Sequence, residues 1–320
     1  MNNNTQNNPL VSIIIPTYKR GINFLDRAIK SVIYQTYTNI EIIVVDDNAC
    51  SSLKVFRDNN EELLKKYPYI SFLKNKTNMG GALSRNEGIK KSNGKFITFL
   101  DDDDIYLPKK IEHQVDFMVK NDLNCSFTDL SIYNENDELI DKRCRNDIKS
   151  FDKEYLIRYH LTKTISGTET FMISQKLLFD IGGFDDAIMG QEFYLMFKIL
   201  NYPDLKIGYF ESDDIKAYRT NSEAISTGPN KIKGEKIIYK FKKDHFYLLN
   251  KKEKRYVRCR HRAVMSVANL RNKRPMKALA YLFASFLTSP SIAISEATKL
   301  RKAKKQAKKI NKQWFETIFL

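Results

Sequence analysis

The sequence predicts an α/β protein in which a mainly parallel sheet is covered by helices and is followed by a basic helical region. Two observations predict this class. From Val11 to about Asp104, short and nearly continuous apolar runs alternate with longer amphipathic stretches. Strands buried on both faces have such runs, and strand–helix alternation is typical of a parallel sheet. After residue 250 the chain becomes rich in Lys and Arg, and its apolar spacing becomes helical.

The first hundred residues contain the clearest strand and helix patterns. The expected strands are VSIII (Val11–Ile15), IEIIVV (Ile40–Val45), ISFL (Ile70–Leu73) and KFITFL (Lys95–Leu100), and the expected helices span 22–35, 51–66 and 80–92. Beyond Asp104 the pattern is looser. There we expect helices over 108–121 and 191–201, a strand pair formed by 124–132 with 138–143, and strands at 168–174, 205–210 and 215–219.

Composition divides the chain into three segments. Residues 1–8 are a polar lead-in that we expect to be disordered and that lacks the features of a signal peptide. Residues 9–228 form the α/β domain, and 229–320 form a basic, largely helical region. Residues 251–320 hold 19 Lys and Arg against three Asp and Glu, which accounts for the whole net charge of +16. The cysteines follow no metal-binding or disulfide spacing, which favours a reducing cytoplasm.

The C-terminal region contains one apolar stretch, Ala278–Ile294, that is followed by the basic segment Lys299–Lys312. The stretch is interrupted by Ser, Thr and Pro and is shorter than the roughly 20 residues that span a bilayer. An apolar helix beside a basic one is typical of a helix lying on an anionic membrane surface. A helical hairpin packed on the domain, or an oligomer contact, is the alternative that the sequence leaves open.

Polar clusters follow three of the predicted strands at the point where each strand ends. The clusters are Pro16-Thr17-Tyr18, Asp46-Asp47-Asn48 and Asp101-Asp102-Asp103-Asp104. Ligands of open parallel sheets bind at the carboxyl ends of the strands. Four adjacent aspartates raise one another's pKa or need a cation, and Mg²⁺ and Mn²⁺ bind both carboxylate and phosphate oxygens. We therefore expect a metal held against a diphosphate; the alternative is a solvated acidic turn that caps the following helix.

These blocks resemble the donor half of glycosyltransferase family 2, which has the Rossmann-like GT-A fold. They are VSIIIPTYKR, IEIIVVDDN, NMGGALSRNEGI and GKFITFLDDDDIYLP, and Gly182–Leu200 resembles the acceptor-side segment of the family. The resemblance runs from about Leu10 to Ser226. It implies an inverting transfer of a sugar from a nucleotide-sugar, by family habit a UDP-sugar, to a hydroxyl of a glycan, lipid-linked or polymeric acceptor. It also implies surface polysaccharide biosynthesis at the inner face of the cell membrane.

The resemblance implies roles for residues by their position. The donor nucleotide and sugar would be held by Pro16, Thr17, Tyr18, Asp47, Asn78, Arg85, Asp101 and Asp102. Asp101 and Asp103 fall on the D-x-D motif of the family and would bind Mn²⁺ or Mg²⁺, with Asp103 as the principal ligand. Glu192 falls where the family keeps a carboxylate as general base. Asp185 and Asp186 are the neighbouring alternatives for this base.

Three other functions are disfavoured. A dinucleotide-binding dehydrogenase would need G-x-G-x-x-G after the first strand, where this chain has PTYKRG. A nucleic-acid-binding protein would need a recognition motif, which the basic tail lacks, so we expect no nucleic-acid partner. A non-catalytic sensor of nucleotide-sugars, or a binder of anionic surfaces, is the remaining alternative. The sequence leaves a homo-oligomer open.

Overall fold

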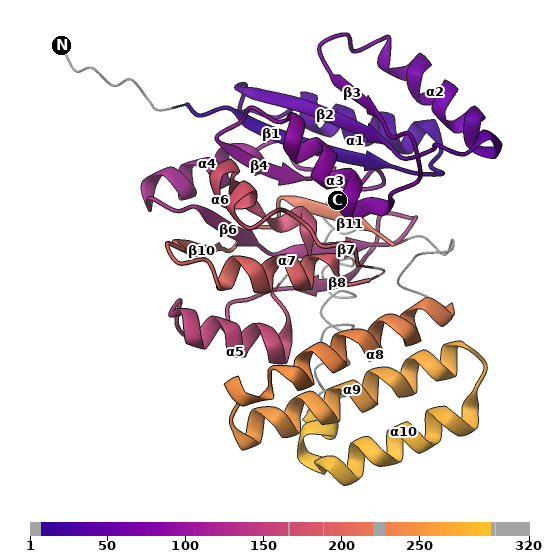
Figure 1. Cartoon of the computed structure of the whole chain (residues 1–320), viewed down its shortest axis with the longest axis vertical. Helices are drawn as coiled ribbons and strands as arrows, with labels where there is room; N and C mark the ends of the chain where they lie inside the picture. Colours follow the sequence, from indigo (N-terminus) through magenta and orange to yellow (C-terminus); the bar gives the residue numbers. More distant parts are fainter. Residues whose placement is uncertain (1–7, 166, 188, 220–227, 296–297, 299–320) are drawn as a thin grey trace, which may run out of the picture.

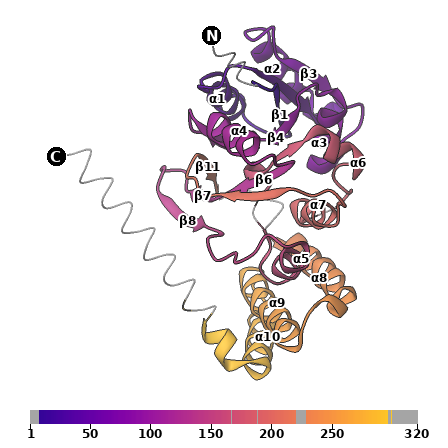
Figure 2. The same ribbon diagram turned by 90° about the vertical axis from the view of Figure 1, so that its left-hand side faces the viewer.

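The computed structural model describes residues 8–165, 167–187, 189–219, 228–295 and 298 (Figure 1). Most of the predicted lead-in and the predicted basic helix Lys299–Lys312 lie outside the described residues. The described chain forms a central sheet, a smaller second sheet, helices around both, and a helical unit at one end of the molecule (Figures 1 and 2). The mainly parallel α/β class predicted from the sequence is confirmed.

The central sheet has seven strands in the order β10-β6-β9-β4-β1-β2-β3. The strands are β1 (Val11–Thr17), β2 (Ile40–Asp46), β3 (Ser71–Lys74), β4 (Phe96–Phe99), β6 (Cys125–Thr128), β9 (Met172–Ser174) and β10 (Ile207–Phe210). All neighbours are parallel except β9, which is antiparallel to both β4 and β6. Ile14 of β1 packs in one buried cluster, and Ile13 and Ile15 pack in another. The run of apolar residues is continuous because both faces of the strand are covered.

Seven helices accompany the two sheets. They are α1 (Ile22–Ile33), α2 (Lys54–Leu64), α3 (Gly80–Lys91), α4 (Lys110–Lys120), α5 (Lys153–Lys163), α6 (Gln175–Asp180) and α7 (Gln191–Leu200). The sequence patterns predicted α1–α4 and α7 and missed α5 and α6. Both faces of α5 are buried over much of its length, from Leu156 to Thr162, so the period of an amphipathic helix is absent there.

The second sheet has the order β5-β11-β7-β8, formed by β5 (Ile105–Tyr106), β11 (Ile215–Tyr218), β7 (Leu130–Tyr133) and β8 (Leu139–Arg143). The predicted pairing of 124–132 with 138–143 is therefore wrong in its first half. β6 belongs to the central sheet, and only β7 pairs with β8. The chain changes sheets at Asp129, a buried residue whose Oδ1 accepts a hydrogen bond from the Tyr209 hydroxyl at 2.5 Å. That partner lies 80 residues away, so local spacing gave no sign of the break.

The helical unit consists of α8 (Gly228–Asp244), α9 (Lys251–Arg271) and α10 (Pro275–Thr288). α8 and α9 pack on the α/β domain, because Val257 of α9 belongs to the same buried cluster as Phe193 of α7 and Phe241 of α8 packs against that cluster. The apolar stretch Ala278–Ile294, for which the sequence left a packed hairpin open, begins in α10, which packs against α9 and buries Ala278 and Ser285. Its contact with a membrane surface stays a prediction. α10 exposes large apolar side chains: Met276, Leu279, Leu282, Phe283, Phe286 and Leu287. Among the described helices, none has the length and apolar character needed to cross a bilayer.

Candidate active site

The polar clusters lie at one edge of the central sheet because β4, β1 and β2 are adjacent and parallel. Backbone bonds tie the three strand ends together. The Asp47 N–H donates to the Thr17 carbonyl at 3.0 Å, and the Leu100 N–H donates to the Ile14 carbonyl at 3.0 Å. Thr17 is buried, with its Oγ1 unpartnered among the described residues, whereas Tyr18 is 41% exposed beyond the strand end. Pro16 is the last but one residue of β1.

Asp47 connects the end of β2 to the start of α3. Its carboxylate accepts four hydrogen bonds: two from the Asn75 and Asn78 side-chain amides, at 2.7 and 3.0 Å, and two from the backbone N–H groups of Met79 and Gly80, each at 2.8 Å. These bonds engage every lone pair of the carboxylate and cap the helix N-terminus. In the described arrangement, two predicted donor ligands, Asp47 for the nucleoside and Asn78 for the phosphates, bind each other. Their roles in donor binding stay predictions.

Arg85 joins three parts of the site. Its Nη2 forms an ion pair with Asp101, which follows β4, and its Nη1 donates to Oε1 of Gln191 at 3.0 Å, at the start of α7. Gln191 precedes Glu192, the predicted base. The structure therefore brings the predicted phosphate ligand, the first aspartate of the D-x-D motif and the α7 terminus into one neighbourhood. Gly81 leaves room for this contact, since a Cβ there would lie 3.1 Å from Arg85 Nη1.

The aspartate run is partly neutralised by Arg20, a residue that the sequence reasoning missed although it ends the PTYKR block. Arg20 Nε lies 3.0 Å from Asp102 Oδ1, and its Nη2 lies 2.8 Å from Asp103 Oδ2. Burial raises the pKa of Asp102 despite Arg20. Burial, reinforced by the charge of Asp101, raises the pKa of Asp103 to about 6. The charge of Arg20 thus does not offset the effect of burial on the pKa of either carboxyl group.

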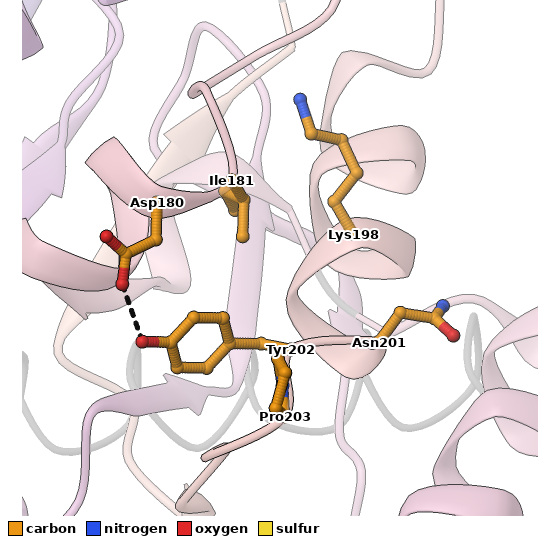
Figure 3. Close-up of a pocket in the computed structure, with 6 residues that line it drawn as sticks. All are labelled: Asp180, Ile181, Lys198, Asn201, Tyr202 and Pro203. Carbon is orange, nitrogen blue, oxygen red and sulfur yellow. Dashed lines mark hydrogen bonds between the residues drawn. The ribbon is translucent and has the colours of Figure 1, made fainter.

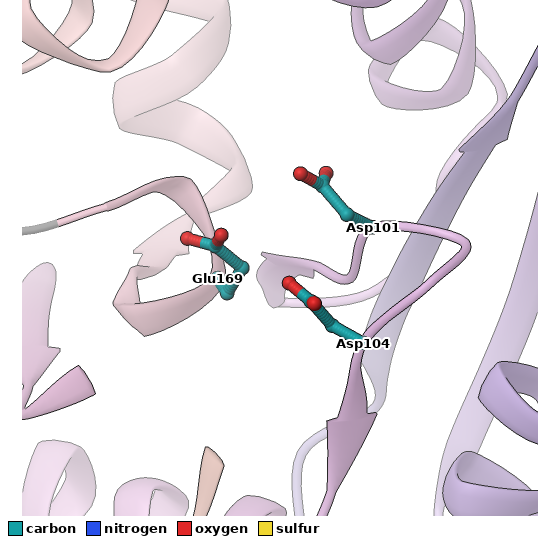
Figure 4. Close-up of side chains that lie close together, drawn as sticks. All are labelled: Asp101, Asp104 and Glu169. Atoms are coloured by element: carbon teal, nitrogen blue, oxygen red, sulfur yellow. The ribbon is translucent and has the colours of Figure 1, made fainter. Parts of the chain in front are cut away.

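Two aspartates of this run form an acidic group with Glu169. Asp101, Asp104 and Glu169 each place one carboxylate oxygen within 4.8 Å of the others, and Figure 4 shows the three side chains facing one another. Burial and the nearby Asp101 raise the pKa of Glu169 to about 7, and Glu169 Oε2 has no partner among the described residues. Converging oxygens of this kind fit a hard divalent cation.

Of the two predicted metal ligands, Asp101 belongs to this group, and Asp103 faces Arg20 instead. The assignment of the metal to Asp103 stays a prediction. Glu169 was missed because it lies 68 residues after Asp101 in a segment that reads only as a strand. Neither spacing nor composition marks it, and only the position of the turn Thr168–Thr170 beside β4 brings it to the aspartates.

Glu192 lines a cavity of about 800 Å³ between the α/β domain and the helices α8 and α9. Burial raises the pKa of its carboxyl group, which strengthens it as a base. Of the alternatives for this role, Asp185 is held at the surface by Lys198 Nζ at 2.8 Å. A smaller hollow of about 360 Å³ lies between α6 and the end of α7, where the Tyr202 hydroxyl donates to Asp180 at 2.6 Å (Figure 3). It contains none of the predicted site residues.

Comparison with known proteins finds relatives of a single kind. The sequence model described as Glycosyl transferase family 2 matches residues 12–182. An uncharacterized glycosyltransferase of Rickettsia typhi is 33% identical over 242 residues, which are 72% of this chain and 70% of that protein. The Escherichia coli protein WfgD, named UDP-Glc:alpha-D-GlcNAc-diphosphoundecaprenol beta-1,3-glucosyltransferase, is 36% identical over 129 residues, or 40% of this chain and 48% of WfgD. For several other curated relatives, the chain spans between 21% and 62% of their length.

The solved structure of GalNAc-T7 with UDP, GalNAc and Mn²⁺ has a TM-score of 0.54 and 17% identity, and covers 80% of this chain and 55% of that one. This likeness concerns the fold and agrees with the predicted GT-A architecture. The family match covers more than half of the chain, and it includes the strand ends and the aspartate run described above. The chain therefore belongs to glycosyltransferase family 2.

Proposed function

We propose that the chain is an inverting glycosyltransferase that moves a sugar from a UDP-sugar to an acceptor hydroxyl. The observation that carries the proposal is the convergence of Arg85, Asp101 and the start of α7 at the carboxyl edge of the sheet. A donor at this edge would have cationic and carboxylate groups on its diphosphate side and Glu192 on its acceptor side. The names of WfgD and of the GalNAc-T7 complex, both of which include UDP compounds, support the nucleotide.

In this proposal the donor is held by the residues that the family resemblance assigns. Pro16, Thr17, Tyr18 and Asp47 contact the base and ribose, Asn78 and Arg85 the phosphates, and Asp101 and Asp102 the ribose or sugar. Asp101 and Asp103, with Asp104 and Glu169 as further oxygen donors, would hold Mn²⁺ or Mg²⁺. A divalent cation bound there would supply positive charge to the departing diphosphate.

Glu192 performs the proton transfer in the proposed reaction. Its carboxylate takes the proton of the acceptor hydroxyl as the oxygen attacks the anomeric carbon from the face opposite the diphosphate. Arg85 is held in place by Asp101 and Gln191, so its charge is oriented before the donor arrives. Such fixed positive charge stabilises the leaving group without reorganisation during the reaction.

The acceptor is a glycan, lipid-linked or polymeric molecule of surface polysaccharide biosynthesis, and the protein acts at the inner face of the cell membrane. The name of WfgD, which includes a diphosphoundecaprenol acceptor, supports a lipid-linked substrate. The exposed apolar side chains of α10, together with the basic residues of 251–320, support contact with an anionic membrane surface.

A panel of nucleotide-sugars tests the proposal. Each sugar is incubated with the full chain and Mn²⁺, and both nucleoside diphosphate release and thermal stabilisation are measured. We expect one UDP-sugar to stabilise the protein and to be turned over, and EDTA to abolish both effects. Asp103→Ala should lower the affinity for Mn²⁺. Absence of binding by every nucleotide-sugar, together with unchanged Mn²⁺ affinity in Asp103→Ala, would refute the proposal and favour a binder of anionic surfaces.

A further inference from the structure

The cavity that Glu192 lines is surrounded by more cationic than anionic side chains. It lies between β8 and the segment that follows it, the end of α5, the start of α7, and the helices α8 and α9. Its described lining includes seven Lys and Arg residues and four Asp and Glu residues. Apart from Glu192, none of the residues assigned to the donor or the metal lines it. A ligand in this cavity would therefore approach Glu192 from the side away from the donor.

Most of the lining charges are already paired. Asp141 pairs with Arg143, Asp147 with Lys163, and Glu235 with Lys231. Lys142 pairs with Asp213 outside the cavity at 2.5 Å. These pairs use every lining carboxylate except that of Glu192. Two further lining cations, Arg145 and Lys242, take no part in these ion pairs.

Arg145 and Lys242 lack a carboxylate partner within 4.0 Å among the residues that the structure describes. The Arg145 guanidinium donates to the Cys144 carbonyl at 2.8 Å, and its Nε is buried without a partner in the described chain. The ammonium of Lys242 lies 5.0 Å from the centre of the Phe193 ring, on the helix turn that carries Glu192. Both cations thus line the same cavity as the predicted base Glu192.

The third cation, Arg260, increases the positive charge of this group. Its Nη1 donates to the Tyr256 hydroxyl at 3.1 Å. Burial lowers the pKa of Lys242 to about 8. The charge of Arg260 also lowers this pKa, and its effect is larger than the opposite effect of Glu235. Burial also lowers the pKa of Arg145, and Arg143 and Arg260 contribute to that shift. Like charges gathered in a partly buried cavity destabilise the folded protein unless an anion joins them.

We infer that this cavity binds a phosphate group of the acceptor, with Arg145 and Lys242 as its ligands and the charge of Arg260 nearby, while the acceptor hydroxyl faces Glu192. The inference rests on the proposed function and deepens it. A guanidinium fork and an ammonium are the side chains that bind phosphate oxygens most strongly in proteins. A volume of about 800 Å³ accommodates a sugar or polyol together with its phosphate. The phosphate belongs to a prenyl diphosphate-linked sugar or to a polyol-phosphate chain, which share this chemistry.

Binding of matched small probes tests the inference without relying on turnover. N-acetylglucosamine 1-phosphate and N-acetylglucosamine are titrated into the full chain by calorimetry, in the presence of EDTA. We expect the phosphate-bearing probe to bind about tenfold or more tightly than the neutral one, and to weaken as salt is added. Lys242→Met and Arg145→Gln should each remove most of this preference, and Arg145→Lys should restore part of it.

Lys142→Met is the matched control, because Lys142 lines the same cavity and is already paired with Asp213. Equal affinity for the two probes would overturn the inference, and so would an unchanged preference in both Lys242→Met and Arg145→Gln. Donor hydrolysis by the unaltered protein, measured in the same preparation with Mn²⁺, separates the two proposals. Hydrolysis without phosphate preference refutes only the acceptor site. A prenyl diphosphate-linked sugar and a polyol-phosphate oligomer, offered as acceptors, then identify the source of the phosphate.

Discussion

Replacement of Lys242 by Met should stabilise the folded protein while it weakens acceptor binding. The pKa of Lys242 is lowered from its ordinary value of 10.5 to about 8, first by burial and then by Arg260. A difference of about 2.5 pKa units, at roughly 1.4 kcal/mol each, corresponds to about 3 kcal/mol. Because part of the side chain reaches solvent, we expect a gain of about 1–3 kcal/mol in the free energy of unfolding at pH 7.

The gain depends on pH in a defined direction. Below pH 8 the lysine is protonated in both the folded and the unfolded chain, so the folded state bears the whole cost of the buried charge. Between pH 8 and 10.5 the folded protein loses this proton first, and the cost decreases. Above pH 10.5 the cost of the buried charge has disappeared, because the lysine is neutral in both states. The stabilisation by Met should therefore be greatest near neutral pH and small in alkaline solution.

Urea unfolding of the unaltered protein and of Lys242→Met, at pH 7 and at pH 10.5, measures this difference. Lys240→Met is the control, because Lys240 lies on the same helix with its side chain exposed. We expect no change of stability in the control. A Met variant that is less stable than the unaltered protein at pH 7 would show that the charge of Lys242 is already compensated. The cavity would then have no uncompensated positive charge at Lys242 with which to attract an anion.

Three further substitutions test other parts of the structure. Glu192→Gln should lower the transfer rate by about 10²–10⁴-fold with donor affinity unchanged. Burial raises the pKa of Glu192, so the rate of the unaltered enzyme should fall as the pH drops through a value above 4.5. The Gln variant should lack this pH dependence. Asp47→Ala should cost about 2–4 kcal/mol in urea unfolding, since it removes the acceptor of the buried Asn75 amide and of the Met79 and Gly80 N–H groups at the start of α3; a neutral result would contradict the capping role. Gly88→Ala should cost about 1–3 kcal/mol, because its Cβ would lie 2.5 Å from Ile14, whereas Gly21→Ala has room and should cost less.

The sequence alone was sufficient to predict the polar edge of the central sheet. Nearly continuous apolar runs predicted β1, β2 and β4, because strands covered on both faces exclude polar residues along their whole length. The polar residues that end these strands then had to lie together, since adjacent parallel strands end at the same edge. For this reason the sequence alone predicts that Asp47 lies near the aspartate run Asp101–Asp104.

The tertiary structure alone decided the contacts between distant segments. Glu169 reaches Asp101 and Asp104, Arg20 pairs with the aspartate run, and Lys242 approaches the α7 helix through pairings that no local period encodes. Asp129, where the chain changes sheets, likewise accepts a hydrogen bond from Tyr209, 80 residues further on. Hydrophobic periodicity reports which face of an element is buried and not which element covers it. Packing supplies that second fact, and it placed a cationic cavity beside the predicted base.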